Sequence, residues 1–126
     1  MRFNHITLRV ADIPRARAFY LTLGFRFVVD EPHYCRFLAP TGDATLSIEK
    51  HDEVFKPGDQ IGLEFDSLEA LDGEVARLEA AGLTFAQRPT DQSWLWRDAR
   101  LIDPDGHELM LYYAGRNRLD PPWRVR

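Results

Sequence analysis

Two segments decide the fold of this chain: Asn4-His5-Ile6-Thr7-Leu8-Arg9-Val10 and Gln60-Ile61-Gly62-Leu63-Glu64-Phe65. In both, apolar residues alternate with polar or small ones, which is typical of a β-strand with one buried face. Each segment is followed by residues at helical spacing that end at a glycine, Gly24 in the first half and Gly82 in the second. The chain therefore uses the same plan of elements twice.

The repeated plan predicts one βαβββ unit in each half. The first half is expected to contain strands at about 3–10, 25–30, 34–39 and 44–50, with a helix from Asp12 to Gly24. The second is expected to contain strands at about 60–65, 83–88, 96–102 and 107–113, with a helix from Ser67 to Ala81. Residues 50–59 are polar and contain Pro57-Gly58, which indicates a linker, and residues 89–93 are expected to form a loop.

These units predict an α+β fold. A repeat of this length cannot bury its sheet alone, so the two copies are expected to pack together. Their strands should form a curved mixed sheet that encloses a cup, with the helices on the outside. We expect a single domain over residues 1–114, made of repeats at about 3–50 and 59–113. Residues 115–126 form a tail rich in arginine and proline that cannot continue the sheet.

Composition narrows the class of protein. Hydrophobic residues make up 44% of the 126 residues and charged residues 29%, as in ordinary globular domains. The net charge of −4 argues against a nucleic-acid partner, and no apolar stretch approaches the roughly 20 residues that span a bilayer. Cys35 is the only cysteine and lies in a strand-like run, so we expect it to be a small buried side chain. A cytoplasmic location is the expectation from these features.

The side chains that alternate with the apolar ones are expected to line the cup. Aligning the first strands pairs His5 with Gln60, and aligning the last strands on Leu46 and Leu109 pairs Ser47 with Met110. The predicted ligand-binding residues are these four positions and their neighbours on the same side of the strands: His5, Arg9, Ser47, Glu49, Gln60, Glu64, Met110 and Tyr112. Arg9 and Glu64 could instead form an ion pair between the halves.

The chain resembles the vicinal oxygen chelate superfamily, which includes glyoxalase I, type I extradiol dioxygenases and the fosfomycin- and bleomycin-resistance proteins. The resemblance rests on the first strand with His5, on the helix end at residues 18–25, and on Asp103-Pro104-Asp105-Gly106-His107-Glu108-Leu109. It covers nearly all of residues 3–113. It implies a divalent metal held by the residues that match His5, Ser47, Gln60 and Met110, and subunits that pair as a homodimer.

The residues of this chain match that metal set only in part. His5 matches fully, and Gln60 matches a less common ligand of the family. Ser47 does not match, and Met110 stands where the family usually has a glutamate, although a thioether is a poor ligand for hard divalent ions. Glu49 and Glu108 lie one step along their strands, about 6.6 Å away, and would need a bulge or a shifted register to serve the same metal. The inherited metal site is therefore expected to be degenerate, so no metal cofactor is assigned.

Three functions remain open. The leading hypothesis is a protein related to the bleomycin-resistance proteins, which binds and sequesters a small organic, possibly aromatic, ligand in the cup. The runner-up is a divalent-metal-dependent lyase or ring-cleaving dioxygenase that uses His5, Gln60 and a displaced carboxylate such as Glu108. The third is an association module that acts through the tail and the neighbouring Trp94 and Trp96, which could equally form the rim of the cup.

Overall fold

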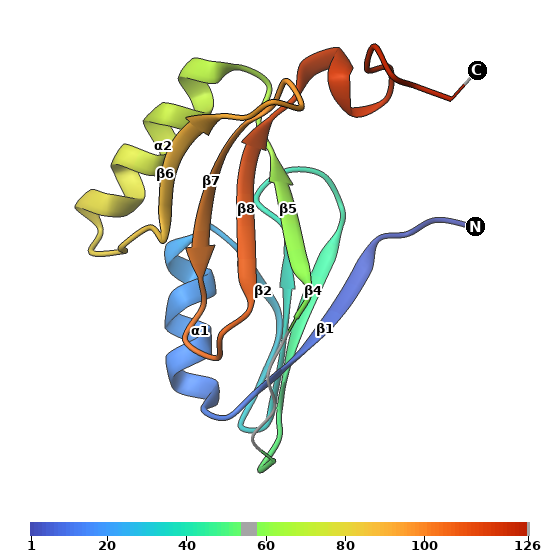
Figure 1. The fold of residues 1–126 in the computed structure, drawn as a ribbon. Coiled ribbons are helices and arrows are strands. Elements are labelled where there is room, and N and C mark those ends of the chain that lie inside the picture. Colours follow the sequence, from blue (N-terminus) through green and yellow to red (C-terminus); the bar gives the residue numbers. More distant parts are fainter. Residues whose placement is uncertain (54–57, 126) are drawn as a thin grey trace. The chain divides into compact units, whose positions relative to one another are not determined.

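The computed structural model describes residues 1–53 and 58–125, and its chain divides into two compact units. The first unit comprises Met1–Lys56 together with the short segment Asp103–Gly106, and the second comprises Pro57–Ile102 and His107–Arg126. Within these described residues, each unit contains one α-helix and one four-stranded sheet. Figure 1 shows the helices and strands along the chain. The predicted α+β fold of two tandem βαβββ units is confirmed.

The first unit follows the predicted order of elements. It contains β1 (His5–Val10), α1 (Ile13–Thr22), β2 (Arg26–Glu31), β3 (Tyr34–Leu38) and β4 (Thr45–Lys50). The sheet order is β1-β4-β3-β2, with β1 parallel to β4 and the other pairs antiparallel. Asp12 caps α1, since its side chain accepts a hydrogen bond from the backbone of Arg15 at 3.0 Å. The helix is followed by Gly24, whose φ of 97° suits glycine far better than other residues.

Alternation along the strands of the first unit separates its core from its polar side chains. Leu8 and Val10 of β1 are buried, whereas His5, Thr7 and Arg9 are exposed. The core also contains Cys35, which is fully buried as predicted. At its edge the hydroxyl of Tyr20 donates a 2.7 Å hydrogen bond to Asp103, and burial raises the pKa of this phenol.

The second unit repeats the arrangement. It contains β5 (Gln60–Glu64), α2 (Leu68–Ala80), β6 (Gln87–Asp91), β7 (Arg97–Ile102) and β8 (Glu108–Tyr113), followed by a short 3₁₀ helix over Gly115–Arg118. The sheet order is β5-β8-β7-β6, with β5 parallel to β8. The apolar stripe of α2 is buried together with alternate residues of β7 and β8; these core residues are Leu71, Val75, Leu78, Leu101, Leu109 and Leu111.

The position of β6 corrects the sequence prediction. We expected a strand at 83–88 and a loop at 89–93, but β6 covers Gln87–Asp91. The backbone N–H of Leu83 donates to the carbonyl oxygen of Leu78, so this residue finishes the helix instead of starting a strand. Pro89 fits inside β6 because the strand lies at the sheet edge and its pairing with β7 is irregular between Gln87 and Thr90.

Two further expectations concern the linker between the repeats and membrane-spanning segments. The predicted linker begins inside β4, which includes Lys50, and its residues 54–57 lie outside the described part of the chain. Within residues 1–53 and 58–125, neither helix has the length and apolar character needed to cross a membrane.

Gly62 of β5 gives a test of the packing in the second unit. A Cβ atom added at this position would lie 3.1 Å from Cε1 of Tyr112, which is buried. We expect Gly62→Ala to lower the free energy of unfolding by about 1 kcal/mol in urea denaturation, because the ring must move out of its packed position. Gly73→Ala is the matched control. Gly73 lies inside α2 with nothing within 4 Å of the added Cβ, so alanine should raise stability by up to about 1 kcal/mol. A Gly62→Ala protein as stable as the wild type would contradict this packing.

Candidate functional site

Strand pairing in the second unit brings three rows of side chains together on one side of the sheet. Across β7, β8 and β5 the rows are Asp98–Tyr112–Glu64, Arg100–Met110–Gly62 and Ile102–Glu108–Gln60. The intervening residues of β7 lie on the side of α2, since Arg97 forms a 2.9 Å ion pair with Asp72 of that helix. We call the side away from α2 the Tyr112 face and define it by Gln60, Gly62, Glu64, Asp98, Arg100, Glu108, Met110 and Tyr112.

An aromatic stack lies on the Tyr112 face. The rings of Trp96 and Tyr112 are nearly parallel, with centroids 4.6 Å apart and an interplanar angle of 13°. Met110, Tyr112 and Ala114 form a buried apolar cluster against which the partly buried Trp96 packs. The indole N–H of Trp96 donates a 3.3 Å hydrogen bond to the carbonyl oxygen of Asn117, which fixes the ring orientation.

Two polar pairs flank this stack. Arg118 donates a hydrogen bond to the carboxylate of Glu64 at 3.1 Å, and Gln60 donates one to Glu108 at 2.6 Å. The pKa of Tyr112 is raised, first by burial and then by the negative charge of Glu64, with Arg118 acting in the opposite direction. The phenol therefore stays protonated at neutral pH, and the stack presents neutral aromatic rings between charged neighbours.

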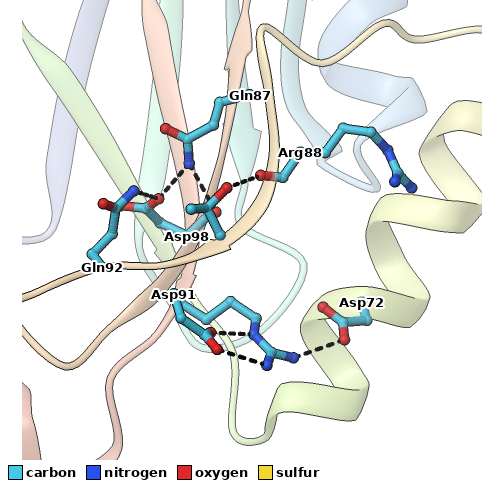
Figure 2. Close-up of polar contacts among 8 residues, drawn as sticks. Asp72, Gln87, Arg88, Asp91, Gln92 and Asp98 are labelled. Atoms are coloured by element: carbon cyan, nitrogen blue, oxygen red, sulfur yellow. Dashed lines mark hydrogen bonds and ion pairs between the residues drawn. The ribbon is translucent and has the colours of Figure 1, made fainter.

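A buried carboxylate completes the Tyr112 face. Figure 2 shows Asp98 between the side chains of Gln87 and Gln92. One oxygen of Asp98, Oδ1, accepts hydrogen bonds from both amides, at 2.6 Å from Gln87 and 2.9 Å from Gln92. Arg100 follows on the same side of β7, with its guanidinium 3.7 Å from Asp98 and 3.8 Å from Glu108.

The corresponding side of the first unit is more polar. His5 lies opposite Thr45 in the sheet, and its ring nitrogens lie 2.6 Å from the hydroxyl of Thr45 and 3.2 Å from that of Thr7. Ser47 is fully buried and shares a 2.7 Å hydrogen bond with the hydroxyl of Tyr34.

Next along this side, Arg9 lies opposite Glu49 in the pairing of β1 with β4. Glu49 also lies 3.0 Å from a ring nitrogen of His51. The first unit therefore offers hydroxyl groups, an imidazole and charged side chains at the positions where the second unit has an aromatic stack.

The eight predicted ligand-binding residues thus divide equally between the units. His5, Arg9, Ser47 and Glu49 lie on one side of the first sheet, and Gln60, Glu64, Met110 and Tyr112 lie on the Tyr112 face of the second. That the two sets line one cup stays a prediction. Glu64 has Arg118 as an ion-pair partner within its own unit, a contact that the sequence analysis did not anticipate.

The register of β5 and β8 gives the surroundings of Glu108. We expected Glu108 to lie one step along its strand from Met110 and to need a bulge or a shifted register before it could serve the same metal as His5 and Gln60. In the observed register Glu108 lies directly opposite Gln60 and accepts its hydrogen bond, because β5 and β8 pair in parallel with these two residues side by side. Whether Glu108 reaches such a metal stays a prediction.

The four positions that the family uses for metal do not offer a suitable set of donors. Ser47 is engaged with Tyr34, and Met110 offers a buried thioether, which leaves one imidazole and one amide. In the part of the chain that the structure describes, no three histidine, cysteine, aspartate or glutamate side chains lie close enough together to hold a metal ion. The metal implied by the resemblance therefore does not fit these four residues.

A cavity of about 340 Å³ lies on the opposite side of the second sheet, beside α2. Its lining includes Arg88 and Arg97, and both are already paired with carboxylates. Arg88 is paired with Glu79, and Arg97 is paired with Asp91 and Asp72. Figure 2 shows the positions of Asp91 and Asp72. These arginines lower the pKa of Glu79 and of Asp91. The described residues that line this cavity include no aromatic side chain, so it is a weaker candidate than the Tyr112 face.

Sequence reasoning missed Asp98 and Arg100 as site residues. It compared the first and last strands of each repeat, where the family places its metal ligands, and considered the segment just before β7 only for Trp94 and Trp96. The signal was present in the spacing of Trp96, Asp98 and Arg100, which are two apart and so share a side.

Comparisons with known proteins agree with this fold. Among solved structures, a glyoxalase/bleomycin resistance protein/dioxygenase from Nocardioides superposes with a TM-score of 0.82 at 19% identity, covering 100% of this chain and 90% of that one. A superfamily member from Sphaerobacter thermophilus DSM 20745 gives a TM-score of 0.72 at 26% identity, covering 90% and 97%. Lactoylglutathione lyase from Agrobacterium tumefaciens gives 0.74 at 16% identity, covering 89% and 92%.

The comparison with curated proteins gives no match. The family model for the Glyoxalase/Bleomycin resistance protein/Dioxygenase superfamily matches residues 2–111, which is nearly the whole length of both repeats. With the two βαβββ units and their sheet order, this match shows that the chain belongs to the Glyoxalase/Bleomycin resistance protein/Dioxygenase superfamily.

Proposed function

We propose that this protein binds a small organic ligand with an aromatic ring on its Tyr112 face and sequesters it. The observation that carries the proposal is the stack of Trp96 on Tyr112, next to Met110. Aromatic rings and a thioether form an adaptable apolar wall, and polar groups beside such a wall orient a ligand.

The geometry of the stack favours binding by ring contact. One side of the indole of Trp96 lies against Tyr112, and the indole is only partly buried, so a ligand ring can pack on the remaining exposed surface. The hydrogen bond from Trp96 to Asn117 holds the indole in place before a ligand arrives. A preorganised ring loses little conformational entropy when a ligand binds, which favours affinity.

The proposal includes the polar side chains of both units as ligand contacts. In the second unit these are Gln60 and Glu64 at the two ends of the Tyr112 face. In the first they are His5, Arg9, Ser47 and Glu49, provided that the two sides line one cup. A single domain over residues 1–114 that works as a homodimer in the cytoplasm remains part of this proposal.

A second candidate is a divalent-metal-dependent lyase or ring-cleaving dioxygenase that uses His5, Gln60 and Glu108. The observation that favours it is the register of β5 and β8, which places Glu108 opposite Gln60 without any shift. Lactoylglutathione lyase from Agrobacterium tumefaciens shares the fold, although the low identity limits that likeness to the fold alone.

Substitution of the tryptophans tests the first proposal. Indole and 2-naphthol are titrated into the wild type and the two variants Trp96→Ala and Trp94→Ala, with thermal midpoints and calorimetry as readouts. The midpoint of the wild type should rise with probe concentration, as expected when a ligand binds the folded state. Trp96→Ala should weaken binding about tenfold through the loss of ring contact. Trp94 is two residues away and exposed, so Trp94→Ala is the matched control and should bind like the wild type. Equal binding by all three proteins would rule out the stack as the site.

Metal analysis tests the second candidate. The protein is purified without chelator, and divalent ions are measured in the wild type, in His5→Ala and in Glu108→Gln. The enzyme hypothesis expects about one ion per chain in the wild type and its loss in both variants. Ser93→Ala is a control outside the three proposed ligands. A wild type that takes up no ion from added Mn²⁺, Fe²⁺ or Zn²⁺ would eliminate this candidate.

A further inference from the structure

Asp98 has an unusual environment for a buried carboxylate. Its side chain is fully buried on the Tyr112 face, and its Oδ1 accepts hydrogen bonds from Gln87 and Gln92. Its other oxygen, Oδ2, is buried and has no hydrogen-bond partner within residues 1–53 and 58–125, although it forms a long ion pair with Arg100. Nearly all buried polar atoms in proteins have such a partner, so an orphaned carboxylate oxygen indicates a missing group.

Arg100 lies on the same side of β7 as Asp98 and contributes a buried hydrogen-bond donor. Its Nη2 lies 3.7 Å from Oδ2 of Asp98, and its Nη1 lies 3.8 Å from Glu108, both longer than hydrogen bonds. Its Nε is buried and, among the described residues, has no hydrogen-bond partner. The guanidinium thus forms long ion pairs with two carboxylates and no close hydrogen bond with either. Oδ2 of Asp98 and Nε of Arg100 are a buried acceptor and a buried donor on residues two apart in β7.

The charges around Asp98 and Arg100 restrict which chemical groups can bind beside these two residues. A free anion would contact Arg100 but would be repelled by Asp98 and Glu108, and a free cation would contact Asp98 but would be repelled by Arg100. A neutral group that donates one hydrogen bond and accepts another next to it satisfies both Oδ2 of Asp98 and Nε of Arg100 without adding charge. The edge of a lactam, pyridone or ureide, where an N–H lies beside a carbonyl, has this pattern.

We propose that Asp98 and Arg100 form a subsite that recognises such an amide-type edge on the ligand that packs against Trp96. This inference rests on the proposed function and names the chemical class of its ligand. Oδ2 of Asp98 accepts the ligand N–H, and Nε of Arg100 donates to the ligand carbonyl. Gln87 and Gln92 fix Oδ1 and so orient Oδ2 in advance (Figure 2). Register places Asp98 opposite Tyr112 and Arg100 opposite Met110, so the subsite adjoins the aromatic wall.

The test uses ¹H–¹⁵N spectra of the full chain, in which the Trp96 indole and the Arg100 Nε–H give separate signals. The probes are 2-pyridone, which carries the amide edge, and 2-methoxypyridine, which has the same ring but no donor. Benzoate and benzylamine represent the anionic and cationic alternatives. We expect 2-pyridone to shift both signals and to bind about tenfold more tightly than 2-methoxypyridine.

Two variants and one control assign the effect to these residues. Arg100→Lys keeps the charge but removes the Nε donor, and should weaken binding of 2-pyridone about tenfold while leaving 2-methoxypyridine unchanged. Asp98→Asn keeps an oxygen for the two glutamines and should cause a similar loss; if it does not fold, the lysine variant carries the test. Arg97→Lys changes the same residue type on the α2 side of β7 and should bind 2-pyridone like the wild type.

The outcomes separate this inference from the function on which it rests. If both pyridine probes shift the Trp96 signal with equal affinity, the subsite is wrong and the aromatic site stands. Tighter binding of benzoate or benzylamine that depends on Arg100 or Asp98 would replace the amide edge with an ionic group. If none of the probes, nor indole or 2-naphthol, shifts the Trp96 signal, both the proposed function and the subsite are wrong.

Discussion

One helix can cover only one side of a four-stranded sheet, and the remaining features of each unit follow from this limit. Side chains alternate along β8, so Leu109 and Leu111 are buried on the side of α2 while Met110 and Tyr112 lie on the other. A slip of one residue would exchange the two sets and place polar groups against the helix. Because the apolar residues of β8 must face α2, the residues that alternate with them are the ones available to contact a ligand on the other side of the sheet.

The two repeats obey this limit in the same way but have different chemistry on the side away from the helix. Ser47 in β4 and Met110 in β8 occupy matching positions, and their neighbours differ accordingly. Ser47 bonds to Tyr34, whose hydroxyl also accepts a hydrogen bond from Arg36 at 3.0 Å. Met110 instead belongs to an apolar cluster with Tyr112. The duplicated backbone has thus retained its hydrophobic pattern while the residues that could contact a ligand have diverged.

Most of the fold could be predicted from the sequence because local rules decided it. The alternation around Leu8 and the glycine after each helix give the elements their type and limits. Local rules failed at β6, because the backbone of Leu83 caps the end of α2 and an edge position tolerates Pro89. They do not give the pairing of Glu108 with Gln60, since cross-strand register depends on how two distant strands pair.

The site was harder to predict because its most informative residue is unusual only in context. An aspartate in a strand is a common surface residue. The spacing from Trp96 places Asp98 on the side of that ring, but it does not predict that Asp98 is buried while Asp91 in the neighbouring strand is exposed. Burial makes the difference: Asp91 is exposed and paired with Arg97, while Asp98 is buried with one oxygen unsatisfied. A buried carboxylate of this kind usually costs stability compared with an apolar side chain of similar size. Positions where a chain keeps such a cost are places where function is expected, which is why the buried Asp98 is a stronger candidate than the more exposed ion pairs beside α2.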